Sequence, residues 1–413
     1  MSIPIKILVV VDSIDIDDSS GSKANVAFIQ NLKKAGFGLK VYHYSRKKIQ
    51  LDEIDCVSIK EIKFSLWYIL SRLQRIFTRL TSININNSIE SLFGFSFTFF
   101  NDVKSIQIAL EKENEFHPSW ILTLSKGGSF RPHKALLNIP NWHSRWLAYV
   151  HDPYPAHLYP RPYNWVEPGY YKKWFFFKEV SEKAKHGVFP SQLLKEWMGS
   201  YFPNFLEKGT VIPHQLNSHK LKNSALPQFF HENQFTLLHA GSLMKQRSPE
   251  HLLAAFDVFL EKFPEAKHES QLLLIGYNEY HKNLLDNYLN YSVVHIEGYL
   301  PYDTVYQLQQ KAAVNIILES KSEISPFLPG KFPHCVEANR PILLLGPYYS
   351  ESRRLLGSNY PYRSEVDDIE TISRIIGEMY ISWKDENTSF QLNRNDLIEY
   401  LSVENLKKTM NAL

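Results

Sequence analysis

The sequence has only two cysteines, Cys56 and Cys335, among its 413 residues. Two thiols so far apart exclude a disulfide framework and are too few for a zinc site, and they fit a reducing cytoplasm. A strong charge of one sign is also missing, because 46 Lys and Arg residues face 43 Asp and Glu residues. The net charge of +3 gives no reason to expect nucleic acid as a partner.

Long hydrophobic runs are absent as well. No apolar stretch approaches the roughly 20 residues of a transmembrane helix, and residues 1–11 lead directly into an expected strand rather than forming a secretion signal. We therefore expect a cytoplasmic protein that is either soluble or bound peripherally to the inner face of the cytoplasmic membrane.

Residues 325–345 (SPFLPGKFPHCVEANRPILLL) are the most informative stretch that is present. They read as a loop, a helix that opens at Gly330 and Lys331, and a buried strand at 342–345. Backbone N–H groups and the positive dipole end at the start of a helix favour an anion, so this stretch predicts a phosphate site. The alternative is an ordinary strand-to-helix connection punctuated by Pro and Gly.

Strands and helices alternate through the second half of the chain. The expected strands are 235–240, 271–276, 292–297 and 313–318. The first of them is followed by a short Gly-Ser loop and by basic residues where the next helix begins, which makes a second anion-friendly helix start. Regular alternation predicts an α/β fold with a parallel sheet covered on both faces.

In this order the segments resemble the retaining nucleotide-sugar glycosyltransferases of the GT-B fold, in particular the large group often called family four. The resemblance covers most of the chain and is strongest over 235–347. A strand at 5–11, a loop at Ser20-Gly21 and a strand at 39–42 are similar to the opening unit of the family. The resemblance implies two doubly wound, Rossmann-like parallel-sheet domains facing across a cleft, with the donor bound mostly by the second and the acceptor by the first.

The length fits two domains better than one. We place the N-terminal, acceptor-side domain at 1–212 and the donor-binding domain at 213–392. The segment 187–191 looks like the family's last N-terminal strand before a helix. A helix within about 393–413 is expected to cross back to the first domain, as it does in the family.

By the same resemblance, Arg247 matches the basic residue that neutralises the donor diphosphate, and the helix start at Gly330 and Lys331 matches the phosphate-binding segment, where Lys331 would help to stabilise the leaving group. The backbone of Gly330 to Phe332 would hold phosphate and sugar oxygens, with Gly241 and Ser242 in the facing loop. Preorganised cations and N–H groups stabilise the charge that builds on a leaving diphosphate. The alternative for Arg247 is a solvated charge in the first turn of a helix.

The turn Gly298-Tyr299-Leu300 resembles the loop that binds the nucleobase through backbone groups; the Tyr299 side chain either stacks or belongs to the core, and we favour the core. The family commonly carries two glutamates with seven residues between them, but Pro326 and His334 occupy those positions here. His334 can still bind a ribose hydroxyl through a ring nitrogen. Glu337, one turn later, is the alternative ribose ligand, and Glu319 or Glu323 could supply a carboxylate to the sugar.

In the first half, an apolar strand from Trp146 ends in His151, Asp152 and Pro153. His151 resembles the family's histidine that reaches toward the transferred sugar, and Asp152 is expected to orient its ring. The alternative is a polar strand end with a turn cap. Gly21 in the opening loop, the Gly-rich loop 126–129 and the aromatic loop 154–170 are further candidates for the wall of the cleft.

Residues 60–80 form an amphipathic pattern. Leucines and isoleucines recur at helical spacing beside an arginine stripe (Leu66, Ile69, Leu73, Ile76 and Leu80; Arg72, Arg75 and Arg79). This pattern is typical of a helix on an anionic membrane surface, with Trp67 and Tyr68 as interfacial anchors and a second basic aromatic cluster at 172–178. The alternative is a helix that buries its apolar side in the N-terminal domain.

Together these features predict a retaining glycosyltransferase that moves a hexose-like sugar from a UDP or GDP donor to a hydroxyl of a surface glycan or lipid-linked saccharide. The resemblance implies no metal and no cofactor, and it implies no dedicated enzymic base, because the leaving phosphate helps to take the acceptor proton in the family's front-face mechanism. Two alternatives remain. A catalytically weakened glycan-binding or partner subunit would explain Pro326 and His334, and a nucleotide-sugar epimerase would need paired carboxylates that we do not identify.

Overall fold

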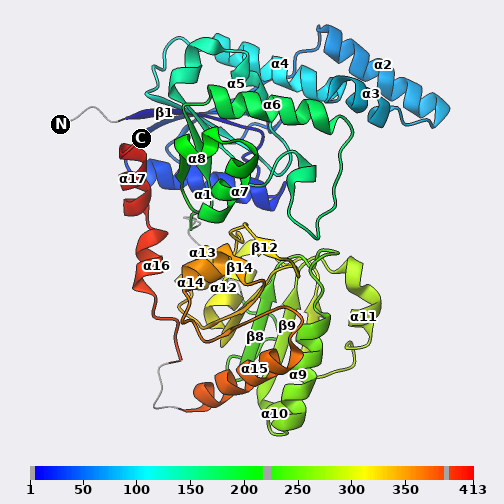
Figure 1. The fold of residues 1–413 in the computed structure, drawn as a ribbon, viewed down its shortest axis with the longest axis vertical. Coiled ribbons are helices and arrows are strands. Elements are labelled where there is room, and N and C mark those ends of the chain that lie inside the picture. The colour runs from blue at the N-terminus through cyan, green and yellow to red at the C-terminus, as the bar shows by residue number, and fades with distance from the viewer. Residues whose placement is uncertain (1–4, 217–224, 386–389) are drawn as a thin grey trace. The chain divides into compact units, whose positions relative to one another are not determined.

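The computed structural model describes residues 5–216, 225–385 and 390–413 and forms two compact units (Figure 1). The first unit contains residues 1–159, 164–218 and 402–413, and the second contains 160–163 and 219–401. Both cysteines are buried free thiols. No helix among the described residues is long and apolar enough to cross a membrane.

The sheet of the first unit is entirely parallel. Its strands lie in the spatial order β3-β2-β1-β4-β5-β6-β7. Their bounds are β1 (Lys6–Val11), β2 (Gly38–His43), β3 (Asp55–Ser58), β4 (Trp120–Leu124), β5 (Trp146–Tyr149), β6 (His186–Phe189) and β7 (Gly209–Val211). The strands expected at 5–11 and 39–42 correspond to β1 and β2. The strand expected at 187–191 corresponds to β6, which a helix follows, and the short strand β7 pairs alongside it at the edge of the sheet.

Helices flank this sheet, and several begin at a serine whose hydroxyl accepts a backbone N–H (Ser19, Ser65, Ser96 and Ser191). Their bounds are α1 (Ser20–Lys34), α2 (Leu66–Thr81), α3 (Asn86–Phe93), α4 (Phe97–Glu111), α5 (Arg131–Leu137), α6 (Tyr170–Lys183), α7 (Gln192–Tyr201) and α8 (Asn204–Lys208). The cap at Ser19 corrects one expectation, because Gly21 lies in the first turn of α1 and not in a loop.

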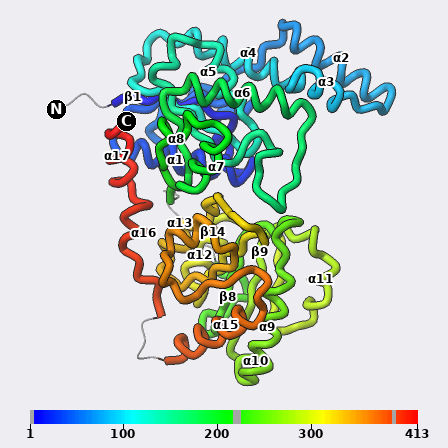
Figure 2. Tube along the Cα trace, in the orientation of Figure 1, coloured from blue at the N-terminus to red at the C-terminus, as the bar shows by residue number. Residues whose placement is uncertain are grey.

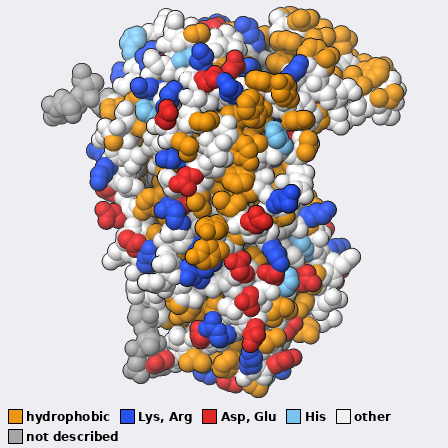
Figure 3. All heavy atoms as spheres, in the orientation of Figure 1, with side chains coloured by type: hydrophobic (Ala, Val, Ile, Leu, Met, Phe, Trp, Pro, Cys, Tyr) orange, Lys and Arg blue, Asp and Glu red, His pale blue; other side chains and the backbone are white. Residues whose placement is uncertain are grey.

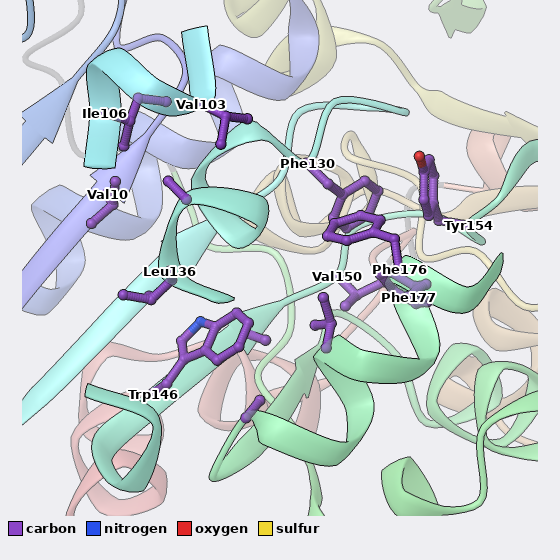
Figure 4. Packing of buried hydrophobic residues seen from close by; sticks show 14 of the residues in the cluster. Val10, Val103, Ile106, Phe130, Leu136, Trp146, Val150, Tyr154, Phe176 and Phe177 are labelled. Atoms are coloured by element: carbon purple, nitrogen blue, oxygen red, sulfur yellow. The ribbon is translucent and has the colours of Figure 1, made fainter. Parts of the chain in front are cut away.

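Aromatic rings fill one side of this unit between the sheet and α4, α5 and α6 (Figure 4). Phe130 packs 4.4 Å from Tyr154 and 5.1 Å from Phe177, measured between ring centroids. Trp146 is fully buried, and its indole N–H donates to the Thr123 hydroxyl at 2.8 Å. The polar end of this large side chain is therefore satisfied inside the core.

The second unit also has a fully parallel sheet, in the order β10-β9-β8-β11-β13-β15. Its strands are β8 (Phe235–Ala240), β9 (Ser270–Ile275), β10 (Val294–Glu297), β11 (Val314–Leu318), β13 (Ile342–Leu345) and β15 (Arg363–Ser364). A separate parallel pair joins β12 (Ile324–Ser325) to β14 (Tyr349–Ser350). The α/β class predicted from the alternating pattern is confirmed.

The helices of the second unit are α9 (Glu250–Lys262), α10 (Ala266–Glu269), α11 (Lys282–Asp286), α12 (Tyr302–Lys311), α13 (Phe332–Glu337), α14 (Glu351–Leu356), α15 (Ile369–Lys384) and α16 (Asn395–Tyr400). Helices α9 and α15 pack together on the sheet, where Tyr380 lies against Phe235 and Phe259. Fully buried strands such as β8 and β13 explain the unbroken apolar runs in the sequence.

The last helix, α17 (Val403–Asn411), belongs to the first unit. It packs beside α1, as the two ends of the colour scale show (Figure 2). Leu406 and Met410 of α17 join the buried cluster that contains Val26 and Ile29 of α1. The end of the chain is thus part of the first hydrophobic core.

Candidate functional site

Lys331 lies between two central strands of the second unit. Its Nζ donates to the Ile316 carbonyl of β11 at 3.0 Å. The same Nζ lies 3.0 Å from Nδ1 of His239, which is the penultimate residue of β8. Burial lowers the pKa of Lys331 to about 7, and the positive charge of Arg247 acts in the same direction. An ammonium group has three protons, and these two contacts use two of them.

His239 is a site residue that is missing from the candidates predicted from the sequence. It is fully buried, and burial beside the cations Lys331 and Arg247 holds its pKa well below the usual range, so the ring is neutral. The signal was present, since a histidine stands near the carboxyl end of an otherwise apolar strand.

Arg247 lies in the connection from β8 to α9. Its Nη1 is 3.4 Å from the Ser242 carbonyl, and its buried Nε has no hydrogen-bond partner among the described residues. Its charge acts on both Lys331 and His239. Arg247 is therefore part of one electropositive cluster with Lys331, and not an isolated surface charge.

The carboxylate of Glu319 faces this cluster from the end of β11. Only 3% of the residue is exposed, and burial raises its pKa to about 7, although the charge of Arg247 opposes the shift. The Ser352 hydroxyl donates to Oε1 at 2.7 Å, whereas the buried Oε2 has no hydrogen-bond partner among the described residues. Glu323, in contrast, is exposed.

The cluster occupies the switch point of the sheet. The strands β8, β9 and β10 extend in one direction from the centre, and β11, β13 and β15 extend in the other. Ligands of open parallel sheets bind outside the carboxyl ends of the strands where the order reverses, which is between β8 and β11 here. Lys331 bonds at that point to both strands.

Two glycines allow the backbone to close around this point. Gly276, at φ +133°, follows β9, and a Cβ there would lie 2.5 Å from the Gly241 carbonyl oxygen. Gly241, at φ +155°, passes beside Lys331, whose Nζ would be 3.7 Å from an added Cβ. These backbone conformations are open mainly to glycine.

The predicted row of backbone donors at Gly330 to Phe332 is only partly available. Helix α13 begins at Phe332, whose N–H donates to the Pro329 carbonyl at 2.8 Å and whose ring is fully buried. We therefore leave Phe332 out of the site. Gly330 is not fully buried, and a Cβ there would meet no atom within 4 Å.

The turn expected to bind the nucleobase joins β10 to α12. The Gly276 N–H donates to the Gly298 carbonyl at 3.1 Å, which links this turn to the glycines of the cluster. Leu300 packs on a buried cluster, but Tyr299 is 74% exposed, so the preference for a core position was wrong.

His334 and Glu337 lie together on α13, as their spacing predicts. His334 Nδ1 is 3.8 Å from Glu337 Oε2, and its Nε2 is 3.2 Å from the Tyr302 hydroxyl of α12. Burial, together with the neighbouring Glu337 carboxylate, raises the pKa of Tyr306 in the same helix. The two candidate ribose ligands therefore lie beside each other, but no hydrogen bond joins them in the described part of the chain.

The first unit has a polar pocket of about 520 Å³ at its own switch point, between β1 and β4. It is lined by residues that follow β1, β2 and β4 and by residues of α4 and α5 (Asp12, Ser13, Asp15, Asp17, Asp18, Tyr44, Ser45, Arg46, Lys47, Thr98, Asp102, Lys126 and Arg131). Of this lining, the sequence pattern predicted only the loop of Lys126, although Asp12 directly follows an apolar strand, which is a readable signal.

Each cation in this pocket is paired with a carboxylate. Lys126 lies 2.7 Å from Asp18, Arg131 lies 2.9 Å from Asp102, and Lys47 pairs with Asp15. Arg46 adds a contact of 3.2 Å to Asp102. The lining is therefore hydrogen-bonding but nearly neutral. Gly21 borders the same loop, since a Cβ there would lie 3.2 Å from Cγ of Lys126.

His151 follows β5 in the same unit. Its Nδ1 lies 3.0 Å from the Ser125 hydroxyl, and its ring stacks on His214 at 5.8 Å. No hydrogen bond to Asp152 is found in the described parts of the chain, so Ser125 orients the ring in its place. Burial and neighbouring histidines hold the pKa of His151 well below the usual range, and burial raises the pKa of Asp152 to about 6.

The aromatic loop 154–170 is divided between the units. Residues 160–163 belong to the second unit, where the Tyr163 and Ser320 hydroxyls lie 2.7 Å apart. Glu167 pairs with Lys173 of α6 at 3.1 Å.

Within residues 5–216, 225–385 and 390–413, no group of three or more His, Cys, Asp and Glu side chains is arranged to hold a metal ion.

Solved structures share this architecture over the whole chain. Sucrose-phosphate synthase from Thermosynechococcus elongatus has a TM-score of 0.65 at 12% identity, covering 98% of both chains. Anabaena HepE in complex with UDP and glucose has a TM-score of 0.59 at 12% identity, covering 99% of this chain and 100% of the other. A UDP-forming trehalose-phosphate synthase from Burkholderia xenovorans in complex with glucose 6-phosphate has a TM-score of 0.62 at 11% identity, covering 98% of this chain and 99% of the other.

The chain therefore has the GT-B fold, and the resemblance predicted from its sequence is confirmed at the level of the fold. No protein-family model matches the sequence, and no curated protein matches it.

Proposed function

We propose that this protein is a retaining glycosyltransferase that transfers a sugar from a nucleoside diphosphate sugar, of the UDP or GDP type, to a hydroxyl of a saccharide acceptor. The single observation that carries the proposal is the Lys331, Arg247 and His239 cluster at the switch point of the second sheet. The complexes of similar folds with UDP, glucose and glucose 6-phosphate support it.

The donor diphosphate would lie against Lys331 and Arg247. Lys331 keeps one ammonium proton beyond its two bonds, and the buried Arg247 Nε offers a donor without a partner among the described residues. Both are fixed before substrate arrives, so they stabilise the charge of the leaving diphosphate without reorganisation. Gly241, Ser242 and Gly330 would let the phosphates approach the backbone closely.

The nucleoside would extend toward α12 and α13. His334 and Glu337 would hold the ribose hydroxyls, supported by Tyr302 and Tyr306. The turn Gly298-Tyr299-Leu300 would bind the base. A histidine in place of the usual glutamate can accept a ribose hydroxyl through Nδ1, which has no hydrogen-bond partner among the described residues.

The acceptor saccharide would occupy the polar pocket of the first unit. Its cations already pair with carboxylates, which favours an uncharged, hydroxyl-rich sugar over a sugar phosphate. His151 is neutral, so it would contact the transferred sugar as a hydrogen-bond partner and not as a cation. The leaving phosphate would take the acceptor proton, and the reaction would need no metal.

The proposed acceptor is a surface glycan or a lipid-linked saccharide, and the proposed location is cytoplasmic, peripheral on the inner face of the cytoplasmic membrane. A catalytically weakened binding subunit is the second candidate, because no acid stands at Pro326 or His334. Turnover separates the two functions.

The test is to incubate the protein, with chelator present, with UDP- and GDP-hexoses and neutral oligosaccharides, and to measure the nucleoside diphosphate that is released. We expect release from one donor, its loss in Lys331→Met, and a product with the anomeric configuration of the donor by NMR. Donor binding without any release would favour the binding subunit. Release with an inverted product would overturn retention.

A further inference from the structure

Helix α2 turns its apolar face away from the first unit. It is attached through the opposite side, where Trp67 stacks on Phe100 of α4 at 4.7 Å and on Phe97 at 5.9 Å. The Ser65 hydroxyl caps α2 and bonds to Asn101 of α4 at 2.6 Å. Trp67 is thus half-buried against α4, so its ring is packed on the protein and is not one of the exposed apolar residues of the helix.

The outward face carries the leucines and isoleucines of the amphipathic pattern. Leu73 is 56% exposed and Leu80 is 80% exposed. The exposed apolar residues of α2, of the following turn and of α3 are Leu66, Ile69, Leu73, Ile76, Phe77, Leu80, Ile83, Leu92 and Phe93. We call this set the α2–α3 face. Hydrophobic side chains gather over these two helices (Figure 3). The helix therefore does not bury its apolar stripe in its own domain.

The charged residues of α2 itself have one sign, and Arg72 lies 3.9 Å from Glu61, which precedes the helix. Helix α2 contains no Asp or Glu, and it carries Arg72, Arg75 and Arg79 on a neighbouring stripe. Glu90 of α3 is already paired with Lys173 at 3.1 Å. An apolar stripe with a cationic border and no acidic residue on its helix matches the boundary of an anionic bilayer, where acyl chains meet phosphate groups.

The face continues next to the start of α6. Gly169, at φ +69°, lies so close to α3 that an added Cβ would be 2.0 Å from the Glu90 carbonyl oxygen. Lys172 donates to the Leu92 carbonyl, and Tyr171 and Phe175 are exposed beside it. In contrast, Phe176 and Phe177 of the same helix are buried, so only part of the predicted cluster at 172–178 is surface.

We propose that the α2–α3 face docks the protein on a bilayer that contains anionic phospholipid, with the apolar residues in the acyl boundary and the arginines at the phosphates. Two features favour a bilayer over a second copy of the chain. The cations border the face without acids on α2 to match them in a copy, and α2 and α3 project from the unit as a pair (Figure 1). The proposal does not depend on the sugar-transfer activity.

The test is flotation of the full chain with vesicles of phosphatidylcholine alone and of phosphatidylcholine with phosphatidylglycerol. Leu73→Glu with Ile76→Glu disrupts the face. Leu289→Glu with Ile381→Glu adds the same charge at exposed apolar positions of the second unit and is the matched control. Thermal unfolding of each variant shows whether it is folded.

We expect wild type and control to float with the anionic vesicles, and the Leu73/Ile76 variant to partition at least tenfold more weakly. Arg75→Gln with Arg79→Gln should weaken partitioning onto anionic vesicles by about fivefold for each arginine, and it should change partitioning onto neutral vesicles little. No flotation of wild type, or equal flotation of the Leu73/Ile76 variant, overturns the proposal. A dimer that this variant dissociates, without vesicle binding, assigns the face to a second copy and also overturns it.

Discussion

Lys331 Nζ and His239 Nδ1 lie 3.0 Å apart, which joins the entry to α13 with the end of β8. The neutral ring accepts from the ammonium, and burial lowers the pKa of Lys331 to about 7. The cation that we assign to the donor diphosphate is therefore one that titrates near neutral pH.

The first prediction is a pH dependence of donor binding. A bound diphosphate favours the ammonium form and raises its pKa, so proton uptake accompanies binding at pH values above 7. The dissociation constant of UDP or GDP should rise between pH 7 and 9, by up to about tenfold per pH unit. Calorimetry across this range measures the slope.

Glu319 also has a pKa of about 7 and faces the same cluster, so its ionisation would weaken anion binding in the same direction. Glu319→Gln removes that contribution and should leave the slope due to Lys331. Lys331→Met should bind weakly and keep only the slope due to Glu319, and the double variant Lys331→Met with Glu319→Gln should have an almost flat profile. A steep profile in the double variant would contradict the assignment.

The second prediction concerns the glycine beside the cluster. Gly276→Ala forces a Cβ to within 2.5 Å of the Gly241 carbonyl oxygen at a positive φ, so it should destabilise the second unit by about 2 to 4 kcal/mol and weaken diphosphate binding. Gly330→Ala is the matched control for stability alone, because its Cβ meets nothing within 4 Å, whereas Gly330 is itself part of the proposed phosphate site. Denaturant unfolding compares them, and equal stabilities would show that the close approach is not present.

The third prediction tests the orientation of α2. Trp67→Ala removes a ring stacked on Phe97 and Phe100, and it should lower the free energy of unfolding by about 2 kcal/mol or more. Leu73→Ala on the outward face should change it by less than about 0.5 kcal/mol. Urea unfolding of both variants measures the difference. A large loss for Leu73→Ala would mean that the stripe is buried.

The order of strands and helices could be read from the sequence, because fully buried parallel strands leave unbroken apolar runs, as at 235–240 and 342–345. Local hydrogen bonds were harder to read. Helix α1 is capped by Ser19 and therefore includes Gly21, and the N–H of Phe332 is already hydrogen-bonded to the Pro329 carbonyl. Neither follows from residue types alone.

Long-range pairing was the other limit. The contacts of His239 with Lys331 and of Ser125 with His151 join residues that are far apart in the sequence, so only the register of the sheets shows them. The direction of the apolar stripe of α2 depended in the same way on where Trp67 found its aromatic partners. Periodicity gives the stripe but not the side on which the helix attaches.

The central claim is that Arg247 and Lys331 form a donor diphosphate site, and calorimetric binding of UDP, GDP, ADP and CMP with chelator present tests it most directly. Arg374→Ala, which removes an exposed arginine of α15, is the control for Arg247→Ala. We predict that one nucleoside diphosphate binds wild type and control alike and binds Arg247→Ala 10 to 100 times more weakly, a loss of about 1.4 to 2.8 kcal/mol. Absence of binding by all four nucleotides, or equal binding by Arg247→Ala, would contradict the account.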